Sequence, residues 1–261
     1  MALDSFKVIC EIEPATRPDL GRVRHQIGVL SPVASAFLIP DNHLGRATVS
    51  SVAVAHEVRD MGGHPIACLN CRDRNLLGLR RDLLTAAAYG VEDFLCVYGD
   101  EPASGGRTSQ LTVRTMIEEI QTWSGDPSLE EGGRFSAGVA TRLGPIPQWK
   151  RDADYIFAQV SFSVEKLVGW RDGLSLSRPV YPGVLVLASA SMARGVAANL
   201  ADVEVPDALM DALERDPAAG VDAACEMVLA LRDSGAFEGV HLVPVGRYRE
   251  VAARLGSTLA I

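Results

Sequence analysis

Four polar residues stand at the ends of short apolar runs in the sequence: Glu11, Asp100, Gln159 and Arg247. In a parallel barrel of alternating strands and helices, apolar side chains fill the interior and reactive groups lie at the carboxyl ends of the strands. We therefore expect these four residues to face one mouth of such a barrel. Together they offer an acid, a hydrogen-bond acceptor, an amide and a planar cation.

Glu11 is the candidate general acid. It lies between Cys10 and Ile12, and loss of water around a carboxyl group favours the protonated form that can donate a proton near neutral pH. A structural role remains open, in which Glu11 caps a helix or pairs with an arginine. Strand alternation places Glu13 on the same face, so the sequence pattern does not separate the two carboxylates.

The other three residues suit the binding of a polar ring and a carboxylate. Asp100 follows Gly99 on an expected tight turn and could accept two hydrogen bonds from an amidine-like ring edge, although an ordinary Asp turn also explains it. Gln159 offers both a donor and an acceptor. Arg247 offers a fork for a carboxylate, although a surface salt bridge is the common fate of a lone arginine.

The cysteines and histidines give weaker signals. Cys68 and Cys71 form a Cys-x-x-Cys pair, but no second pair or well-spaced histidine set completes a tetrahedral metal site. We therefore expect no metal, and we expect the pair to line a pocket or pack in the core. The five histidines are expected to cap or pack.

Strand-like runs alternate with amphipathic stretches, which is typical of repeated βα units. Eight strands are expected, at Phe6 to Ile12, Ala34 to Ile39, Pro65 to Asn70, Asp93 to Tyr98, Arg134 to Ala140, Tyr155 to Val160, Val180 to Leu187 and Val240 to Val245. Helices are expected at Val49 to Met61, Leu76 to Tyr89, Val113 to Trp123, Val164 to Asp172 and Ala223 to Asp233. The fold prediction is α/β, one (βα)8 barrel over residues 1–261, with an extra segment at Val203 to Ala219 that is helical from Pro206. Surface loops are expected at Asp100 to Thr108 and Ser124 to Gly133.

Composition favours a small-molecule partner. The net charge of −8 gives no electrostatic footprint for nucleic acid or an anionic membrane. No targeting segment or run long enough to cross a bilayer is found, so a cytoplasmic location is expected. Five cysteines, an odd number, favour reduced thiols. The oligomeric state stays open, with a homo-oligomer among the alternatives.

Several segments, in order and spacing, resemble the methylenetetrahydrofolate reductase family. They are Cys-Glu-Ile-Glu-Pro (10–14), Cys-Arg-Asp-Arg-Asn (71–75), Asp-Leu-Leu-Thr-Ala-Ala (82–87), Tyr-Gly-Asp-Glu-Pro (98–102), Ala-Asp-Tyr-Ile-Phe-Ala-Gln (153–159), Tyr-Pro-Gly-Val-Leu (181–185), Val-Pro-Asp-Ala-Leu-Met (205–210) and Gly-Val-His-Leu (239–242). The resemblance implies that Glu11 is the acid that opens the methylene bridge of 5,10-methylenetetrahydrofolate to an iminium. It implies that Asp100 and Gln159 hold the pterin and that Arg247 binds the glutamate tail.

The chain departs from the family at the flavin site. Typical members bind FAD with the help of a Tyr-Pro-Glu-x-His-Pro-Glu stretch, where this chain has Ala-Thr-Arg-Leu-Gly-Pro-Ile-Pro-Gln-Trp-Lys (140–150). Cys68 replaces a flavin-contacting histidine. The chain thus resembles flavin-independent members, in which NADH passes hydride directly to the iminium carbon and FAD is not used.

The nicotinamide donor is expected in the vacated flavin site. Cys68, Arg72 and Arg142 are its predicted contacts, with Arg46 and Arg74 as further candidates for a phosphate, and the sequence does not distinguish NADH from NADPH. Three alternatives remain: an FAD-dependent reductase, a deazaflavin-dependent reductase, and a non-catalytic folate-binding or scaffolding subunit.

Overall fold

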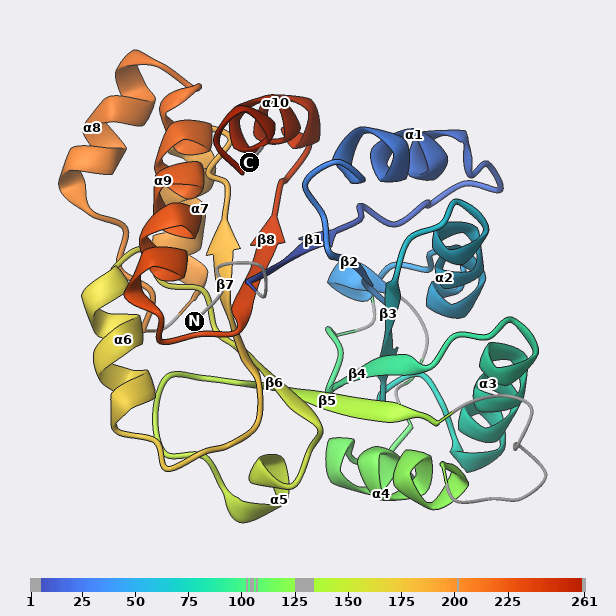
Figure 1. Cartoon of the computed structure of the whole chain (residues 1–261). Helices are drawn as coiled ribbons and strands as arrows, with labels where there is room; N and C mark the ends of the chain where they lie inside the picture. The colour runs from blue at the N-terminus through green and yellow to red at the C-terminus, as the bar shows by residue number, and fades with distance from the viewer. Residues whose placement is uncertain are drawn as a thin grey trace.

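Eight parallel strands close into a barrel in which each strand pairs with its neighbour in the sequence and β8 pairs with β1 (Figure 1). The computed structural model describes residues 6–101, 103, 106, 108–124, 134–200 and 202–259. The strands are β1 (Lys7–Glu11), β2 (Ala36–Ile39), β3 (Pro65–Asn70), β4 (Asp93–Val97), β5 (Ser136–Thr141), β6 (Tyr155–Ala158), β7 (Val180–Leu185) and β8 (Gly239–Val243). The predicted (βα)8 barrel is confirmed.

Helices surround the barrel on its outer side (Figure 1). They are α1 (Gly21–Leu30), α2 (Ser51–Asp60), α3 (Leu76–Ala88), α4 (Val113–Trp123), α5 (Gln148–Arg151), α6 (Val164–Asp172), α7 (Ala190–Asn199), α8 (Asp207–Arg215), α9 (Ala219–Ser234) and α10 (Tyr248–Leu259), with a short 3-10 turn, η2 (His43–Gly45). The helix expected after Pro206 is α8, and it lies between β7 and β8 as predicted. α1, α5, α7 and α10 were not among the expected helices.

Several strands end earlier than their apolar runs. β7 ends at Leu185 rather than Leu187, although Val186 and Leu187 are buried. Val186 and Leu187 are buried by packing although they lie beyond the end of the strand. The apolar run in the sequence is therefore longer than the hydrogen-bonded strand. The predicted loop at 100–108 is described only in part, and most of the predicted loop at 124–133 lies outside the described residues.

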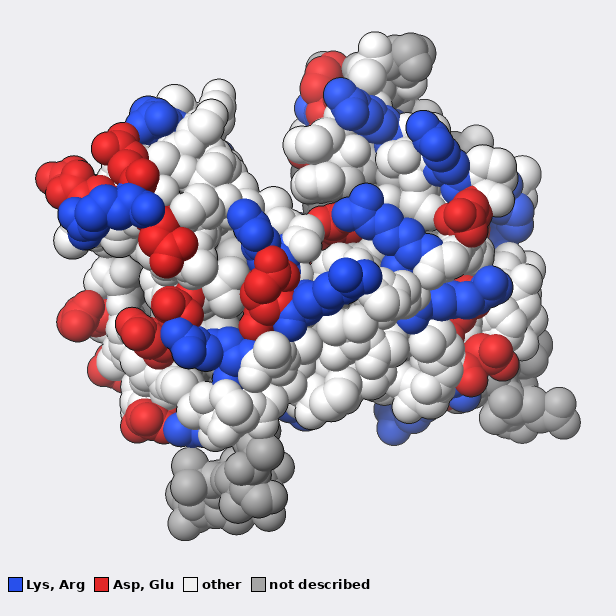
Figure 2. Space-filling view, turned by 90° about the horizontal axis from the view of Figure 1, so that it is seen from above, with Lys and Arg blue, Asp and Glu red and all other residues white. Residues whose placement is uncertain are grey.

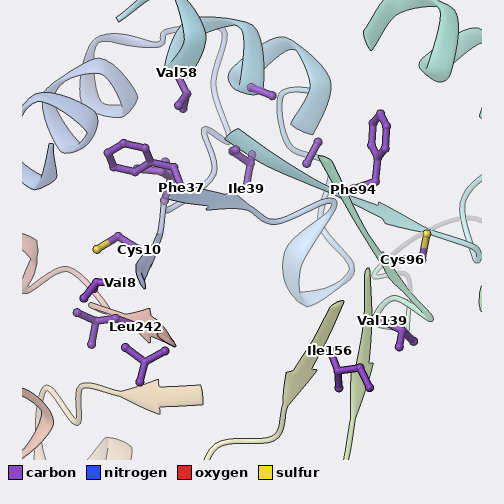
Figure 3. Close-up of a cluster of buried hydrophobic side chains, with 14 of the residues drawn as sticks. Val8, Cys10, Phe37, Ile39, Val58, Phe94, Cys96, Val139, Ile156 and Leu242 are labelled. Carbon is purple, nitrogen blue, oxygen red and sulfur yellow. The ribbon is translucent and has the colours of Figure 1, made fainter. Parts of the chain in front are cut away.

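Strand alternation produces two cores. Outward-facing side chains, among them Val8, Cys10, Phe37 and Ile39, pack between the barrel and the helices (Figure 3). Inward-facing side chains fill the barrel itself, and these are Ile9, Ala36, Leu38, Ile66, Cys68, Leu95, Tyr155, Phe157 and Tyr181. The interior is therefore packed below its mouth, and a ligand can enter only at an end.

Tyr155 is one of two tyrosines in the inner core. Its hydroxyl donates a hydrogen bond of 2.8 Å to the Phe94 carbonyl, and burial raises its pKa well above the ordinary value. The neighbouring strand makes room for this ring with Gly138, where a Cβ atom would lie 2.0 Å from Tyr155 Cε2.

The surface carries both signs of charge close together. Figure 2 shows Lys and Arg side chains lying among Asp and Glu on the face seen from above, which includes α1 and α10 at the top of Figure 1. Ion pairs on the surface, such as Arg254 with Asp222 and Arg24 with Glu57, also bring opposite charges together. Within the described part of the chain, no helix has the length and apolar character needed to cross a membrane.

Gly138→Ala tests the packing inside the barrel. The added methyl group meets a buried ring that is held by its hydrogen bond, so we expect a loss of about 1–3 kcal/mol in the free energy of unfolding. Gly144→Ala is the matched control, because a Cβ there meets no atom within 4 Å. Urea unfolding measures both, and equal midpoints for the two variants would contradict the packing described here.

Candidate active site

A cavity of about 340 Å³ lies at the carboxyl ends of the strands. Of the predicted site residues, Glu11 from β1, Cys68 from β3, Asp100 after β4 and Gln159 after β6 line it together. Its wall also includes Leu38, Asp41, His43, Leu95, Thr141, Phe157 and His241. An acid, an acceptor and an amide that are separated in the sequence thus share one small-molecule-sized site.

Glu11 contacts a histidine inside this cavity. Its Oε2 atom lies 3.2 Å from Nε2 of His241, and the two side chains are 20% and 14% exposed. They come from strands that are hydrogen-bonded to each other, in a register that pairs Cys10 with Leu242. The contact therefore depends on closure of the barrel.

Glu13 lies in a different environment. β1 ends at Glu11, and beyond it the Glu13 carboxylate accepts a hydrogen bond from Arg22 and faces a surface groove with Arg17 and Asp19. It does not line the cavity that contains Glu11. The structure thus separates two carboxylates that strand alternation alone left equivalent.

Asp100 is held on a turn at the rim. Gly99 takes a left-handed φ of 88°, and a Cβ there would lie 2.9 Å from the Asn70 side chain, so glycine is required. The Leu44 amide donates a 2.7 Å hydrogen bond to Asp100 Oδ2, and His43 Nδ1 lies 3.9 Å from the same oxygen. The carboxylate is 52% exposed, so it remains accessible to a ligand.

A buried ion pair forms the wall behind Cys68. Asp41 accepts 2.6 Å and 2.7 Å hydrogen bonds from Arg74 and from the Asn70 amide group. Arg74 also lies 3.1 Å from Asp82. These bonds satisfy the Arg74 guanidinium within the protein, so this predicted phosphate contact is occupied.

Cys68 and Cys71 face opposite sides of the sheet. Cys68 belongs to the inner core and lines the cavity, whereas Cys71 packs in the outer core, where its thiol lies 3.5 Å from the Tyr98 carbonyl. Burial raises the pKa of Cys68 well above its ordinary value, with further contributions from Glu11 and Asp41. The Cys68 thiol is thus a neutral part of the wall.

The remaining predicted arginines lie outside the lining of this cavity. The Arg72 guanidinium lies 4.6 Å from the Tyr98 ring centre and 2.9 Å from Glu101, while its buried Nε has no hydrogen-bond partner among the described residues. Arg142 is exposed just after β5. Arg247 donates to Glu250 and to the Ala188 carbonyl, and lines a groove beside α9 and α10.

A second cavity, of about 410 Å³, adjoins the first. The two share Val97 and Ala140 in their walls. Tyr98, Trp149 and Lys150 line the second cavity, and Lys150 donates a 2.7 Å hydrogen bond to the Ala140 carbonyl. Burial, and then the nearby charge of Arg142, lower the pKa of Lys150. Two aromatic rings and a cation beside the barrel mouth suit a planar, anionic ligand.

Sequence reasoning missed His241, Phe157, Asp41 and His43 as site residues. We had expected the histidines to cap or pack. A usable signal existed for His241, because it alternates with the buried Val240 and Leu242 and so must point into the barrel.

Comparison with known proteins identifies one family that this chain resembles. A sequence profile of the methylenetetrahydrofolate reductase family matches residues 148–255, which span part of the barrel from α5 to α10. The resemblance to this family is confirmed. No curated protein matches the chain.

Solved structures share the fold at low sequence identity. An uncharacterized protein from Clostridium thermocellum that binds two copies of 5-methyl-5,6,7,8-tetrahydrofolic acid is 11% identical, with a TM-score of 0.62 over 98% of this chain and 96% of that one. The long-chain alkane monooxygenase LadA is 11% identical, with a TM-score of 0.56 over 97% and 91%. EDTA monooxygenase from Chelativorans sp. BNC1 is 12% identical, with a TM-score of 0.55 over 97% and 94%. At these identities the structures show a common barrel, not a common reaction.

The thiols provide a test of the buried walls of the barrel. Burial raises the pKa of Cys10 and of Cys96 to about 12, and that of Cys225 to about 11. At pH 8 only about 1 in 10⁴ of the Cys10 and Cys96 thiols is ionised, and only the thiolate reacts. We expect an aromatic disulfide reagent to react slowly with the native protein and rapidly, at all five cysteines, after unfolding in urea. A burst of reaction in the native state would contradict the burial of these groups.

Proposed function

We propose that this protein is a methylenetetrahydrofolate reductase that transfers hydride from NADH directly to 5,10-methylenetetrahydrofolate, giving 5-methyltetrahydrofolate. The observation that carries the proposal is the grouping of Glu11, Asp100 and Gln159 around one cavity at the carboxyl ends of the barrel strands. The family match over residues 148–255 supports the same substrate class. A similarly folded protein that binds 5-methyl-5,6,7,8-tetrahydrofolic acid adds further support.

Glu11 would act as the general acid. Its proton passes to a nitrogen of the methylene bridge, the carbon–nitrogen bond breaks toward that nitrogen, and the remaining iminium carbon becomes electrophilic. Positioned proton donors of this kind contribute about 10²- to 10⁴-fold to a rate. Glu11 is mostly buried in the cavity, so the proton is delivered away from bulk water.

The folate would be oriented by the rim of the cavity. One oxygen of Asp100 is held by the Leu44 amide, which leaves the other to accept hydrogen bonds from the pterin edge. Gln159 also lines the cavity and would complement the ring with its amide. Arg247, in the separate groove beside α9 and α10, would take a carboxylate of the glutamate tail if the tail extends out of the cavity to that groove.

NADH supplies the hydride and would lie across the two adjoining cavities. Cys68 would contact its nicotinamide end inside the barrel. Arg72 and Arg142 would contact the phosphates near Tyr98 and Lys150, and the unpartnered Nε of Arg72 supports that role. Arg74 is already paired with Asp41 and Asp82, which leaves Arg46 as the further candidate for a 2′-phosphate.

A flavin-free assay tests the cofactor assignment. Purified protein is freed of any flavin and mixed anaerobically with NADH and methylenetetrahydrofolate, while NADH loss and methyl-folate formation are followed together. We expect equal amounts of both, and intersecting initial-rate lines because the two ligands bind at once. Parallel initial-rate lines, together with a bound yellow cofactor, would identify an FAD-dependent reductase. Activity only with reduced deazaflavin would identify a deazaflavin-dependent reductase.

Glu11→Gln and Glu13→Gln form a matched pair. The first change removes the acid while keeping its shape, so we expect kcat to fall by more than about 10²-fold with folate affinity within about threefold. Glu13 pairs with Arg22 outside the cavity, so its variant should keep near-normal turnover. Folate binding without turnover in the unmutated protein would instead favour the non-catalytic binding subunit.

A further inference from the structure

We propose that His241 is a positioning residue that supplies and holds the proton of Glu11, so that the two side chains act as one proton-donating unit. This inference rests on the proposed reductase function and deepens it.

The geometry of the pair carries the inference. Strand pairing sets Ile9 opposite His241, and Glu11 is the next inward-facing residue on β1. His241 Nε2 lies 3.2 Å from Glu11 Oε2, yet the alignment falls short of a hydrogen bond, and Nε2 is a buried polar atom without a partner among the described residues. A hydrogen bond to the nearby carboxylate oxygen would satisfy this orphaned nitrogen, since leaving a buried polar atom without a partner costs free energy.

The imidazole is fixed from its other side. The Phe157 ring lies edge-on, with ring centres 5.2 Å apart, and β8 pairs His241 with Gly183 on β7. A side chain at Gly183 would meet Val160, so β7 packs closely against the end of β6 beside the histidine. His241 is therefore confined to the neighbourhood of Glu11.

The other charged and titratable groups of the cavity are already engaged. Asp41 is bound by Arg74. His43 lies beside Asp100 at the rim, and the Cys68 thiol is kept neutral by burial. Of these groups, His241 is the one with a nitrogen within hydrogen-bonding distance of the Glu11 carboxylate.

The proton balance of the reduction requires such a supply. Glu11 gives its proton to the bridge nitrogen as the carbon–nitrogen bond breaks, and the iminium carbon takes hydride from NADH. The Glu11 carboxylate then takes the Nε2 proton of His241, and the neutral imidazole recovers a proton from water. Each turnover consumes one proton and oxidises one NADH. Two coupled groups of this kind exchange protons as a pair, so the proton belongs to the pair rather than to either residue.

Kinetics against pH test the proposal. In His241→Gln and His241→Phe we expect kcat at pH 7.5 to fall about tenfold or more, with the KM for folate within about threefold. The deficit should grow as pH rises, because Glu11 without His241 must take its next proton from a solvent that holds fewer of them. Gln can still donate a hydrogen bond but cannot carry the proton, so full rescue by Gln, or a deficit constant with pH, would overturn the proposal.

His25→Gln is the matched control. His25 lies on α1, where its Nε2 accepts from Arg249 and takes no part in the cavity. Its variant should keep the pH profile of the unmutated protein. Thermal melting of all variants checks folding, and a His241 variant that melts with the unmutated protein but loses activity at high pH would support the proposal.

A second readout separates this inference from the reductase assignment. If the unmutated protein does not reduce methylenetetrahydrofolate, the reductase function is wrong. The contact between Glu11 and His241 is then tested by nuclear magnetic resonance of the His241 ring. In Glu11→Gln the resonance of the His241 Nε2 nitrogen should shift, because that nitrogen then faces an amide in place of a carboxylate. An unchanged resonance would overturn the contact between the two groups.

Discussion

Pairing of β8 with β1 is the contact on which the site depends. The first and last strands of a barrel are distant in the sequence, and their hydrogen bonds bring Glu11 against His241 and close the mouth around Asp100 and Gln159. Gly239 makes this close approach feasible, because a Cβ there would lie 2.1 Å from the Lys7 carbonyl oxygen. The chemistry of the first strand therefore depends on residues more than two hundred positions away.

Below the mouth of the barrel, close packing of aromatic side chains restricts movement of the base of the site. Tyr155, Phe157 and Tyr181 contact one another in the barrel interior, and the Tyr155 hydroxyl is satisfied by a backbone carbonyl. A dense aromatic floor allows little movement. The polar groups above it, by contrast, alternate between buried pairs such as Arg74 with Asp41 and accessible groups such as Asp100. The packed rings thus hold the base of the cavity in place, while groups such as Asp100 at the rim stay accessible to a ligand.

The sequence predicted the barrel because each strand is a short apolar run, and local alternation is enough to find it. Gly62, Gly90 and Gly235 follow helices with a left-handed φ, a position that glycine favours. Sequence reasoning missed α7, whose many small residues give weak contrast, and α5, which has only one turn. The sequence did not show which of Glu11 and Glu13 lies in the site, and it did not distinguish a histidine in the site from one that only packs. Those distinctions depend on where β1 ends and on which strand lies beside it, and neither is local information.

The arrangement of the two cavities bears on how one barrel could change its hydride donor. Glu11, Asp100 and Gln159 belong to the first cavity, whereas Tyr98, Trp149 and Lys150 belong to the second, and only Val97 and Ala140 line both. Groups for the acid and the folate ring are thus separate from those proposed for the phosphates of NADH. The segment 140–150 supplies Ala140, Trp149 and Lys150 to the second cavity, and it supplies only Ala140 and Thr141 to the first. Under the proposed function, changes in residues 149 and 150 would therefore act on the hydride donor rather than on the acid.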